Sequence, residues 1–180
     1  NATIAAGDGS DQSVVEDESP TTLSASGHLV VSDTNGQHYL TMTVAVPSGV
    51  SNLGTLALTA SAIPGISTGD YTYSVSNAIT QYLGASDQRI DMFTVKSIDG
   101  STQTFSFTIQ GVNDAPVRQD NVSQGATIVE IADNAPGENT SSHVAAGSFV
   151  IRDVDLSDSL SWWIDAPAGH LGTMIITAIS

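Results

Sequence analysis

The sequence predicts an all-β fold in the form of a β-sandwich. Short segments alternate apolar and polar residues, so each strand turns one face inward. The composition is rich in Ser, Thr, Gly, Asp and Asn, which favour tight turns between strands. Even spacing of short strands of this kind is typical of sandwiches. The alternating segments are Leu40–Val46, Leu53–Leu58, Tyr71–Val75 and Phe105–Ile109, with turns at Asn35-Gly36, Thr68–Asp70 and Asp99-Gly100.

One helical segment interrupts the strands. Asn77 is expected as its N-cap, Ile79, Tyr82 and Leu83 share one face, and Gly84 follows the last turn. This spacing predicts one or two turns packed across the sandwich.

The charge balance indicates which partners suit the chain. Its 180 residues include 19 acidic and 4 basic side chains, giving a formal net charge of −15. Such a chain repels nucleic acid and anionic lipid, whereas divalent cations offset its charge. It has no cysteine and therefore no disulfide, which makes Ca²⁺ the natural cross-link. No apolar run reaches the ~18 residues of a membrane span, and we expect no membrane insertion.

The chain contains an internal repeat. Gly27 and Gly147 begin matching segments with an offset of 120 residues (147 − 27), which also relates Pro47 to Pro167. After a two-residue deletion, Leu53–Leu56 matches Leu171–Met174. Upstream, Ser13–Glu16 matches Thr127–Glu130. The sequence therefore predicts a complete sandwich over 1–116 and the first part of a second over 117–180.

The second repeat lacks counterparts of three strands, Tyr71–Val75, Met92–Ile98 and Thr104–Ile109. Three explanations stay open. The segment is truncated and supported by the first repeat, another chain supplies the strands, or the modules divide differently from the sequence repeat. The chain, which begins at Asn1 without a signal-type segment, is expected to be part of a longer protein.

Carboxylates cluster in one loop of the second repeat. Asp153, Asp155 and Asp158 lie within six residues and offer the oxygen ligands that Ca²⁺ prefers. The loop is not an EF-hand, because Ile164 stands where that loop needs its bidentate Glu. The alternative is a solvated acidic turn.

The sequence resembles the VCBS-type, cadherin-like repeats of large bacterial surface adhesins. The resemblance is carried by Gly27–Asp33, Tyr71–Val75, Asp91–Val95 and, most specifically, Phe107–Pro116 with its terminal Gly-Val-Asn-Asp-Ala-Pro. It implies an immunoglobulin/cadherin-like Greek-key sandwich in tandem. It also implies a secreted, extracellular location on a bacterial surface.

The resemblance further implies Ca²⁺ at the junction between modules. The ligands carried over by position are Asn113 and Asp114 in the linker and Asp153 and Asp155 in the following loop, with Glu16, Asp17, Glu130 and Asp91 as further candidates. Gly111 stands two places before Asn113, where the family has an acidic residue. A site here would therefore hold fewer ions or bind them more weakly.

The leading function expected is a calcium-rigidified extender or adhesive module of a surface protein or filament, with neighbouring repeats or other copies of the chain as partners. The alternative is a glycan-binding or receptor-binding module in which Trp163 stacks on the ligand. No enzyme is expected. Gly65–Gly69 matches a G-x-S-x-G nucleophile motif but leads into a strand instead of a helix, and the four histidines lack zinc-site spacing.

Overall fold

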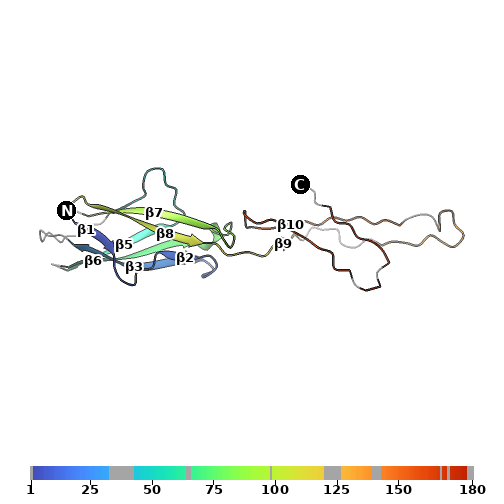
Figure 1. Cartoon of the computed structure of the whole chain (residues 1–180), viewed down its shortest axis with the longest axis horizontal. Coiled ribbons are helices and arrows are strands. Elements are labelled where there is room, and N and C mark those ends of the chain that lie inside the picture. Colours follow the sequence, from blue (N-terminus) through green and yellow to red (C-terminus); the bar gives the residue numbers. More distant parts are fainter. Residues whose placement is uncertain are drawn as a thin grey trace.

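The computed structural model describes residues 2–32, 43–63, 66–97, 99–119, 127–138, 143–166, 168–169 and 171–177. Eight of its strands form two four-stranded sheets. The first sheet has the order β1-β3-β6-β5, and these strands span Thr3–Ala6, Thr22–Ser32, Ile66–Ser76 and Thr55–Ile63. The second has the order β2-β8-β7-β4, spanning Ser13–Val15, Thr102–Gln110, Gln88–Lys96 and Thr43–Ala45. The prediction of an all-β sandwich is therefore confirmed (Figure 1).

The two sheets enclose one apolar core. Tyr73 from β6 stacks on Phe107 from β8 with ring centroids 4.6 Å apart. Tyr71 and Phe93 meet the Phe107 ring edge-on, an arrangement that aromatic quadrupoles favour. Because the rings come from both sheets, they join the two layers. The other buried apolar residues are Ile4, Val14, Leu23, Ala25, Leu29, Val31, Val75, Leu83, Val95, Phe105 and Ile109.

The strand pairs are antiparallel with one exception among the described residues. β2 runs parallel to β8, with Ser13 opposite Thr108 and Val15 opposite Gln110. Main-chain bonds from Thr108 N to Gln12 O and from Glu16 N to Gln110 O, both 2.9 Å, extend this pairing. β2 therefore ends beside the point where β8 leaves the sandwich.

The helical prediction was partly wrong. Residues Asn77–Ile79 form a single 3-10 turn, η1, whose N-cap is Ser76. Asn77 is instead the first residue of the turn and is buried, while Ile79 is exposed. Leu83 alone of the expected apolar face is fully buried. The expected turn at Asn35-Gly36, with Leu40 and Met42, lies outside the described residues.

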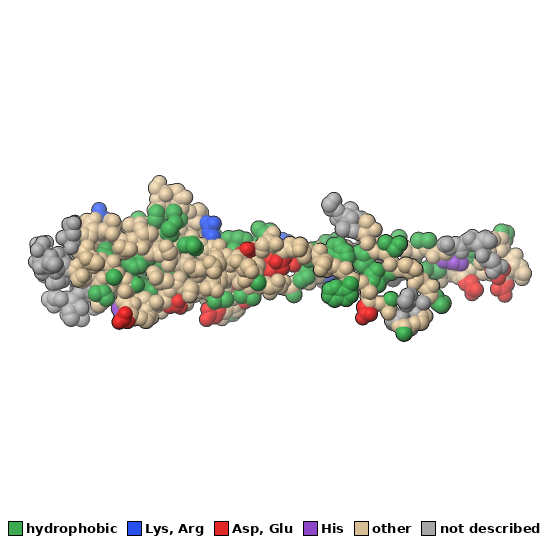
Figure 2. All heavy atoms as spheres, viewed as in Figure 1, with side chains coloured by type: hydrophobic (Ala, Val, Ile, Leu, Met, Phe, Trp, Pro, Cys, Tyr) green, Lys and Arg blue, Asp and Glu red, His purple; other side chains and the backbone are tan. Residues whose placement is uncertain are grey.

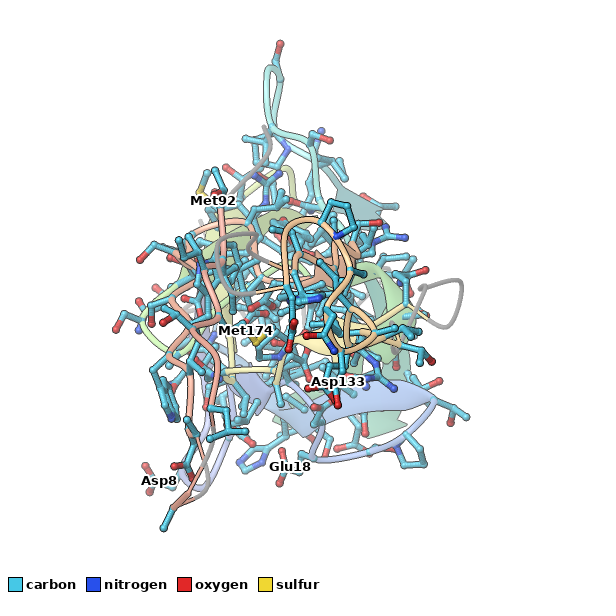
Figure 3. The ribbon with its side chains drawn as sticks, turned by 90° about the vertical axis from the view of Figure 1, so that its right-hand side faces the viewer. Asp8, Glu18, Met92, Asp133 and Met174 are labelled. Carbon is cyan, nitrogen blue, oxygen red and sulfur yellow. The ribbon has the colours of Figure 1, made fainter. Side chains whose placement is uncertain are left out.

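The described residues of the C-terminal segment, 127–177, lie beyond one end of the sandwich, in line with its long axis (Figures 1 and 3). It contributes strand β10, Ile151–Arg152, which pairs with β9, Val117–Arg118. The rest of the described segment has no strand. Its apolar side chains are largely exposed and gather at the surface in Figure 2. The segment therefore has no core of its own in the described part of the chain.

Candidate metal site at the junction

Glu16 places a buried carboxylate at the end of the sandwich. It follows β2 directly and is 1% exposed. Its Oε2 accepts a 3.0 Å hydrogen bond from the main-chain N–H of Val112, and its Oε1 accepts one of 3.0 Å from Gln81 Nε2. Glu16 thus holds the start of the 111–116 linker against the sandwich.

Asp17 lies beside Glu16 and is held by Asn77 of the 3-10 turn and by Gln81 after it. Its backbone has a φ of 60°, in the left-handed region. Asn77 accepts from Asp17 N at 3.0 Å and donates to Asp17 Oδ1 at 2.8 Å. Gln81 also donates to Asp17 Oδ1, at 2.9 Å, and so bridges the two carboxylates. These hydrogen bonds to Asn77 and Gln81 lower the pKa of Asp17.

The linker and the loop of residues 153–158 meet at Asp155. Asp155 Oδ2 accepts a 2.8 Å hydrogen bond from the N–H of Asp114, and Asp153 Oδ1 accepts one of 3.2 Å from Asp155 N. Leu156 N donates to Tyr82 O at 3.1 Å, which fastens the loop to the sandwich. Asp155 is 4% exposed as a result.

Two carboxylate oxygens at this junction are buried without a hydrogen-bond partner, Asp114 Oδ2 and Asp155 Oδ1. A buried carboxylate oxygen without a donor carries an uncompensated desolvation cost. Such atoms mark a place where a further positive group would stabilise the protein.

The charges that raise the pKa values of Glu16 and Asp114 are all carboxylates. Burial is the main cause that raises the pKa of Glu16; the Val112 N–H opposes it, and Asp114, Asp17 and Asp155 add to it. Burial likewise raises the pKa of Asp114, with further contributions from Asp17, Asp155 and Asp153. Five carboxylates, those of Glu16, Asp17, Asp114, Asp153 and Asp155, thus form one electrostatic cluster, which we call the junction cluster. Acidic side chains gather at this waist of the molecule in Figure 2.

The junction cluster is not a finished metal centre. Within the described residues, no three His, Asp or Glu side chains are grouped closely enough to hold an ion. The cluster combines carboxylates from three separate segments, the end of β2, the linker and the 153–158 loop. Ca²⁺ accepts irregular oxygen coordination drawn from distant segments, so these donors suit it chemically once their side chains rotate inward.

Two linker and loop residues predicted as ligands lie beside the cluster without belonging to it. The Asn113 side chain is exposed and donates to Asp114 O at 2.8 Å. Asp158 is exposed, and its N–H approaches Asp155 O at 3.4 Å. Glu130 is exposed on the C-terminal segment and is not among the charges acting on Glu16 or Asp114.

Asp91, a further predicted ligand, lies inside the sandwich. It is fully buried on β7, where it accepts hydrogen bonds from Leu53 N, Gly54 N and the hydroxyl of Tyr73. Its carboxylate is thus saturated inside the sandwich and fixes the loop before β5. The structure thus places Asp91 in the core of the sandwich and outside the junction cluster.

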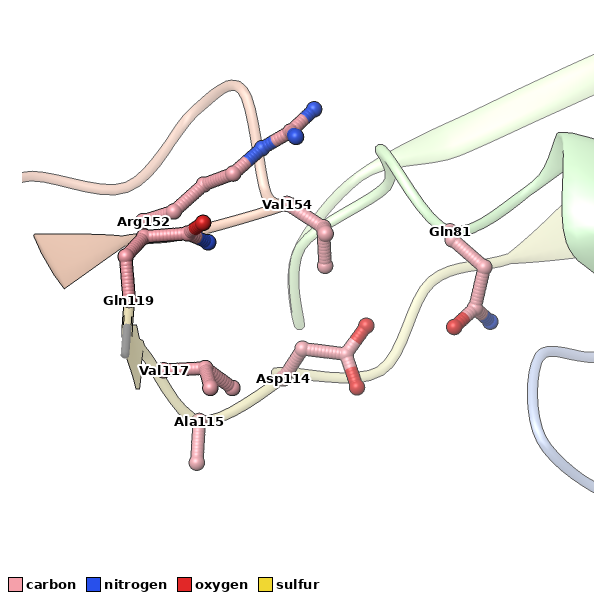
Figure 4. Close-up of a pocket in the computed structure, with 7 residues that line it drawn as sticks. All are labelled: Gln81, Asp114, Ala115, Val117, Gln119, Arg152 and Val154. Atoms are coloured by element: carbon pink, nitrogen blue, oxygen red, sulfur yellow. The ribbon is translucent and has the colours of Figure 1, made fainter. Parts of the chain in front are cut away.

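A cavity of about 440 Å³ borders the junction cluster. It lies between the sandwich and the C-terminal segment, with Asp114 and Gln81 on one side and Arg152 and Val154 on the other (Figure 4). Ala115, Val117 and Gln119 complete its lining. Asp114 therefore lines a space large enough to hold water or a small ion.

Trp163, the predicted ligand-stacking residue, is 83% exposed. Its neighbour Trp162 is 40% exposed. Both indoles therefore lie at the surface of the C-terminal segment.

No protein-family model matches the chain, and a comparison with curated proteins finds no similar sequence. In the described part of the chain, no helix has the length and apolar character needed to cross a membrane.

Proposed function

We propose that the chain is a structural module of a secreted surface protein or filament, made rigid by Ca²⁺ bound at the junction cluster. In this proposal the sandwich is a Greek-key domain of the immunoglobulin/cadherin type, and 117–180 begins a second one. The protein acts as an extender or adhesive spacer. A cation bound at the junction would convert a flexible hinge between the sandwich and 117–180 into a fixed angle.

One observation carries the proposal. Asp114 in the linker and Asp155 in the following loop each leave a buried oxygen unpartnered, although the Asp114 main chain is hydrogen-bonded to Asp155. This hydrogen bond therefore holds the two segments together while the carboxylates of Asp114 and Asp155 repel each other. A divalent cation would offset that repulsion and would also bind the two unpartnered carboxylate oxygens.

The surrounding hydrogen bonds support a site that spans the junction. Gln81 links Glu16 to Asp17, Glu16 holds Val112, and Leu156 bonds to Tyr82. An ion bound by Glu16, Asp114 and Asp155 would thus connect the sandwich, the linker and the C-terminal segment. Asp17 and Asp153, whose charges act on Asp114, are further candidate donors.

Titration of metal-free protein with Ca²⁺ tests the proposal. Both tryptophans lie in the C-terminal segment, so their fluorescence reports on that segment. We expect a saturable change below about 10 mM Ca²⁺, since extracellular modules bind with dissociation constants of ~10⁻⁴–10⁻³ M. A higher unfolding temperature and a narrower distribution of maximum dimensions in X-ray scattering should accompany it.

Magnesium at the same concentration is the matched control, because it requires near-ideal octahedral geometry and keeps its water. If Ca²⁺ leaves fluorescence, unfolding temperature and scattering unchanged, the proposal is wrong.

A second candidate function rests on Trp163. An indole that is 83% exposed offers a flat apolar face to a sugar ring or a protein receptor. Glycan-array binding that Trp163→Ala abolishes and Trp162→Ala retains would favour this function. Absence of binding by the Ca²⁺-loaded protein would count against it.

A further inference from the structure

Gln81 is a neutral side chain among the carboxylates of the junction cluster. It follows η1 and reaches from the sandwich into the cavity, which it lines together with Asp114. In Figure 4 the carbonyl oxygen of Gln81 lies on the side of the Asp114 carboxylate, and its nitrogen lies on the opposite side. Gln81 therefore offers an uncharged oxygen to the space that Asp114 lines.

Two hydrogen bonds determine this orientation of the Gln81 amide. Its Nε2 donates to Glu16 Oε1 at 3.0 Å and to Asp17 Oδ1 at 2.9 Å. An ionised carboxylate only accepts hydrogen bonds, so the amide must turn its nitrogen, and not its oxygen, towards these two residues. The nitrogen and the oxygen are bonded to the same planar carbon and point apart. Glu16 and Asp17 therefore direct Gln81 Oε1 into the cavity.

The two residues that hold Gln81 are themselves fixed by further hydrogen bonds. Glu16 is buried and accepts from the N–H of Val112. Asp17 forms two hydrogen bonds with Asn77, which is also buried. Partners of this kind orient the groups that bind a metal ion. The orientation of Gln81 is therefore set by the protein before any ion binds.

A neutral oxygen suits a cluster that already contains several carboxylates. Ca²⁺ takes about six to eight oxygen ligands, and the carbonyl oxygen of Gln is among those it accepts. A further carboxylate would add to the repulsion between the acids, whereas a carbonyl adds a ligand without adding charge. Asp114 Oδ2 and Asp155 Oδ1 are buried without a hydrogen-bond partner. With Gln81 Oε1, these atoms give one oxygen each from the linker, the 153–158 loop and the sandwich.

We propose that Gln81 binds the junction cation directly through Oε1, and that Glu16 and Asp17 position it by holding Nε2. Each carboxylate oxygen that accepts from Nε2 has a second lone pair, so both acids can still bind the same ion. Gln81 then connects the sandwich to the ion that joins the linker and the 153–158 loop. This inference rests on the proposed function, since it names a ligand of the same ion.

The luminescence of bound Tb³⁺ tests the proposal. Tb³⁺ prefers the same oxygen ligands as Ca²⁺, and its luminescence lifetimes in H₂O and D₂O give the number of water molecules bound to it. Gln81→Met removes both amide groups and keeps the length of the side chain. At saturating Tb³⁺, we expect about one more bound water in this variant, because water takes the place of a lost ligand. Its affinity for Ca²⁺ should fall by ~10-fold or more.

Three further variants make the test specific. Gln119→Met changes the other glutamine that lines the cavity and should alter neither the bound water nor the affinity. Gln81→Glu has an oxygen at both ends of its carboxylate and needs no orientation, so it should keep the original number of bound waters. Gln81→Asn withdraws the carbonyl by a methylene group and should give the extra water even if Gln81→Met does not fold.

The outcomes separate this inference from the proposed function. Saturable Tb³⁺ binding with an unchanged number of bound waters in Gln81→Met and Gln81→Asn would overturn the inference and leave the proposed function in place. Tighter binding by Gln81→Met would also overturn it, because Nε2 would then occupy the place of the ion. An equal gain of water in Gln119→Met would attribute the effect to the cavity as a whole and have the same consequence. Absence of saturable binding by the original protein would overturn both proposals.

Discussion

The hydroxyl of Tyr73 donates a 2.8 Å hydrogen bond to the carboxylate of Asp91, and both side chains are fully buried between the sheets. Burial and the neighbouring carboxylate raise the pKa of Tyr73, so the hydroxyl keeps its proton as a donor. The same carboxylate accepts from Leu53 N and Gly54 N. A single buried acid therefore joins β6, β7 and the loop before β5.

Tyr73→Phe should lower the free energy of unfolding by about 1–3 kcal/mol, because it removes a donor from a buried carboxylate. Tyr71→Phe is the matched control. It also removes a hydroxyl from a buried ring, but that hydroxyl donates to the main-chain oxygen of Asp11, and about 1 kcal/mol is expected. Urea unfolding measures both. Equal losses of unfolding free energy in the two variants would show that the charge of Asp91 does not strengthen the hydrogen bond from Tyr73.

Gly54→Ala should destabilise the sandwich by about 1–3 kcal/mol, since the added methyl group would overlap the ring of Tyr73. The repeat counterpart, Gly172→Ala, should change stability by less than about 0.5 kcal/mol, because its surroundings are open. Thermal unfolding of the two variants gives the comparison. Similar shifts in both would contradict the packing described for Gly54.

The pH dependence of stability should change sign across the acid range. The folded protein has raised pKa values at Glu16 and Asp114, so protonating them favours the folded state. In metal-free solution, their contribution should increase stability as the pH falls from 7 towards the ordinary Glu value of 4.5. Asp17 has a lowered pKa, and its contribution is lost as the pH falls through and below its ordinary 3.8.

Urea unfolding at several pH values tests this dependence. Glu16→Gln, which cannot titrate, should flatten the slope of unfolding free energy between pH 7 and 4.5. Its absolute stability is less informative, because the amide also gives up one of the two hydrogen bonds that Glu16 accepts. A slope identical to that of the original protein would exclude Glu16 as a source.

Asp114→Asn and Asp155→Asn should each weaken Ca²⁺ binding by ~10–100-fold, on the scale found when groups that support a metal site are removed. Both changes preserve size, and the amide oxygen introduced by Asp155→Asn can still accept from Asp114 N. Asp133→Asn removes one charge from an exposed position on the C-terminal segment (Figure 3), and this variant should bind Ca²⁺ as the original protein does. Calorimetric titration distinguishes them; a similar loss in all three would indicate a general charge effect.

Alternation of side chains predicted the buried faces of several strands, although the turn expected at Thr68–Asp70 lies inside β6. Tyr71, Tyr73 and Val75 occupy every second position and form the buried face of β6. Phe105, Phe107 and Ile109 form the buried face of β8 in the same way. The same rule contained a signal about Asp91. It is in phase with the buried Phe93 and Val95, which places its carboxylate inside the sandwich.

A local sequence pattern could not predict contacts between distant segments. The parallel pairing of β2 with β8 joins residues far apart in the sequence, and the sequence of neither strand indicates which strand it pairs with. The roles of Asn77 and Gln81 at the junction were missed for the same reason. Asn77 and Gln81 are four residues apart and both follow β6. Asp17, which both contact, follows β2 of the other sheet.

The parallel pairing of β2 and β8 also determines how the sandwich bears tension. The N-terminus lies at the end away from the linker, and both strands run towards the linker (Figure 1). A pull between the two ends draws β8 forward and β2 back, so the bonds joining them are loaded together in shear instead of opening one after another. Mechanical strength would then depend on β2, one of the shortest strands of the sandwich, and on the Glu16 contact that closes its end.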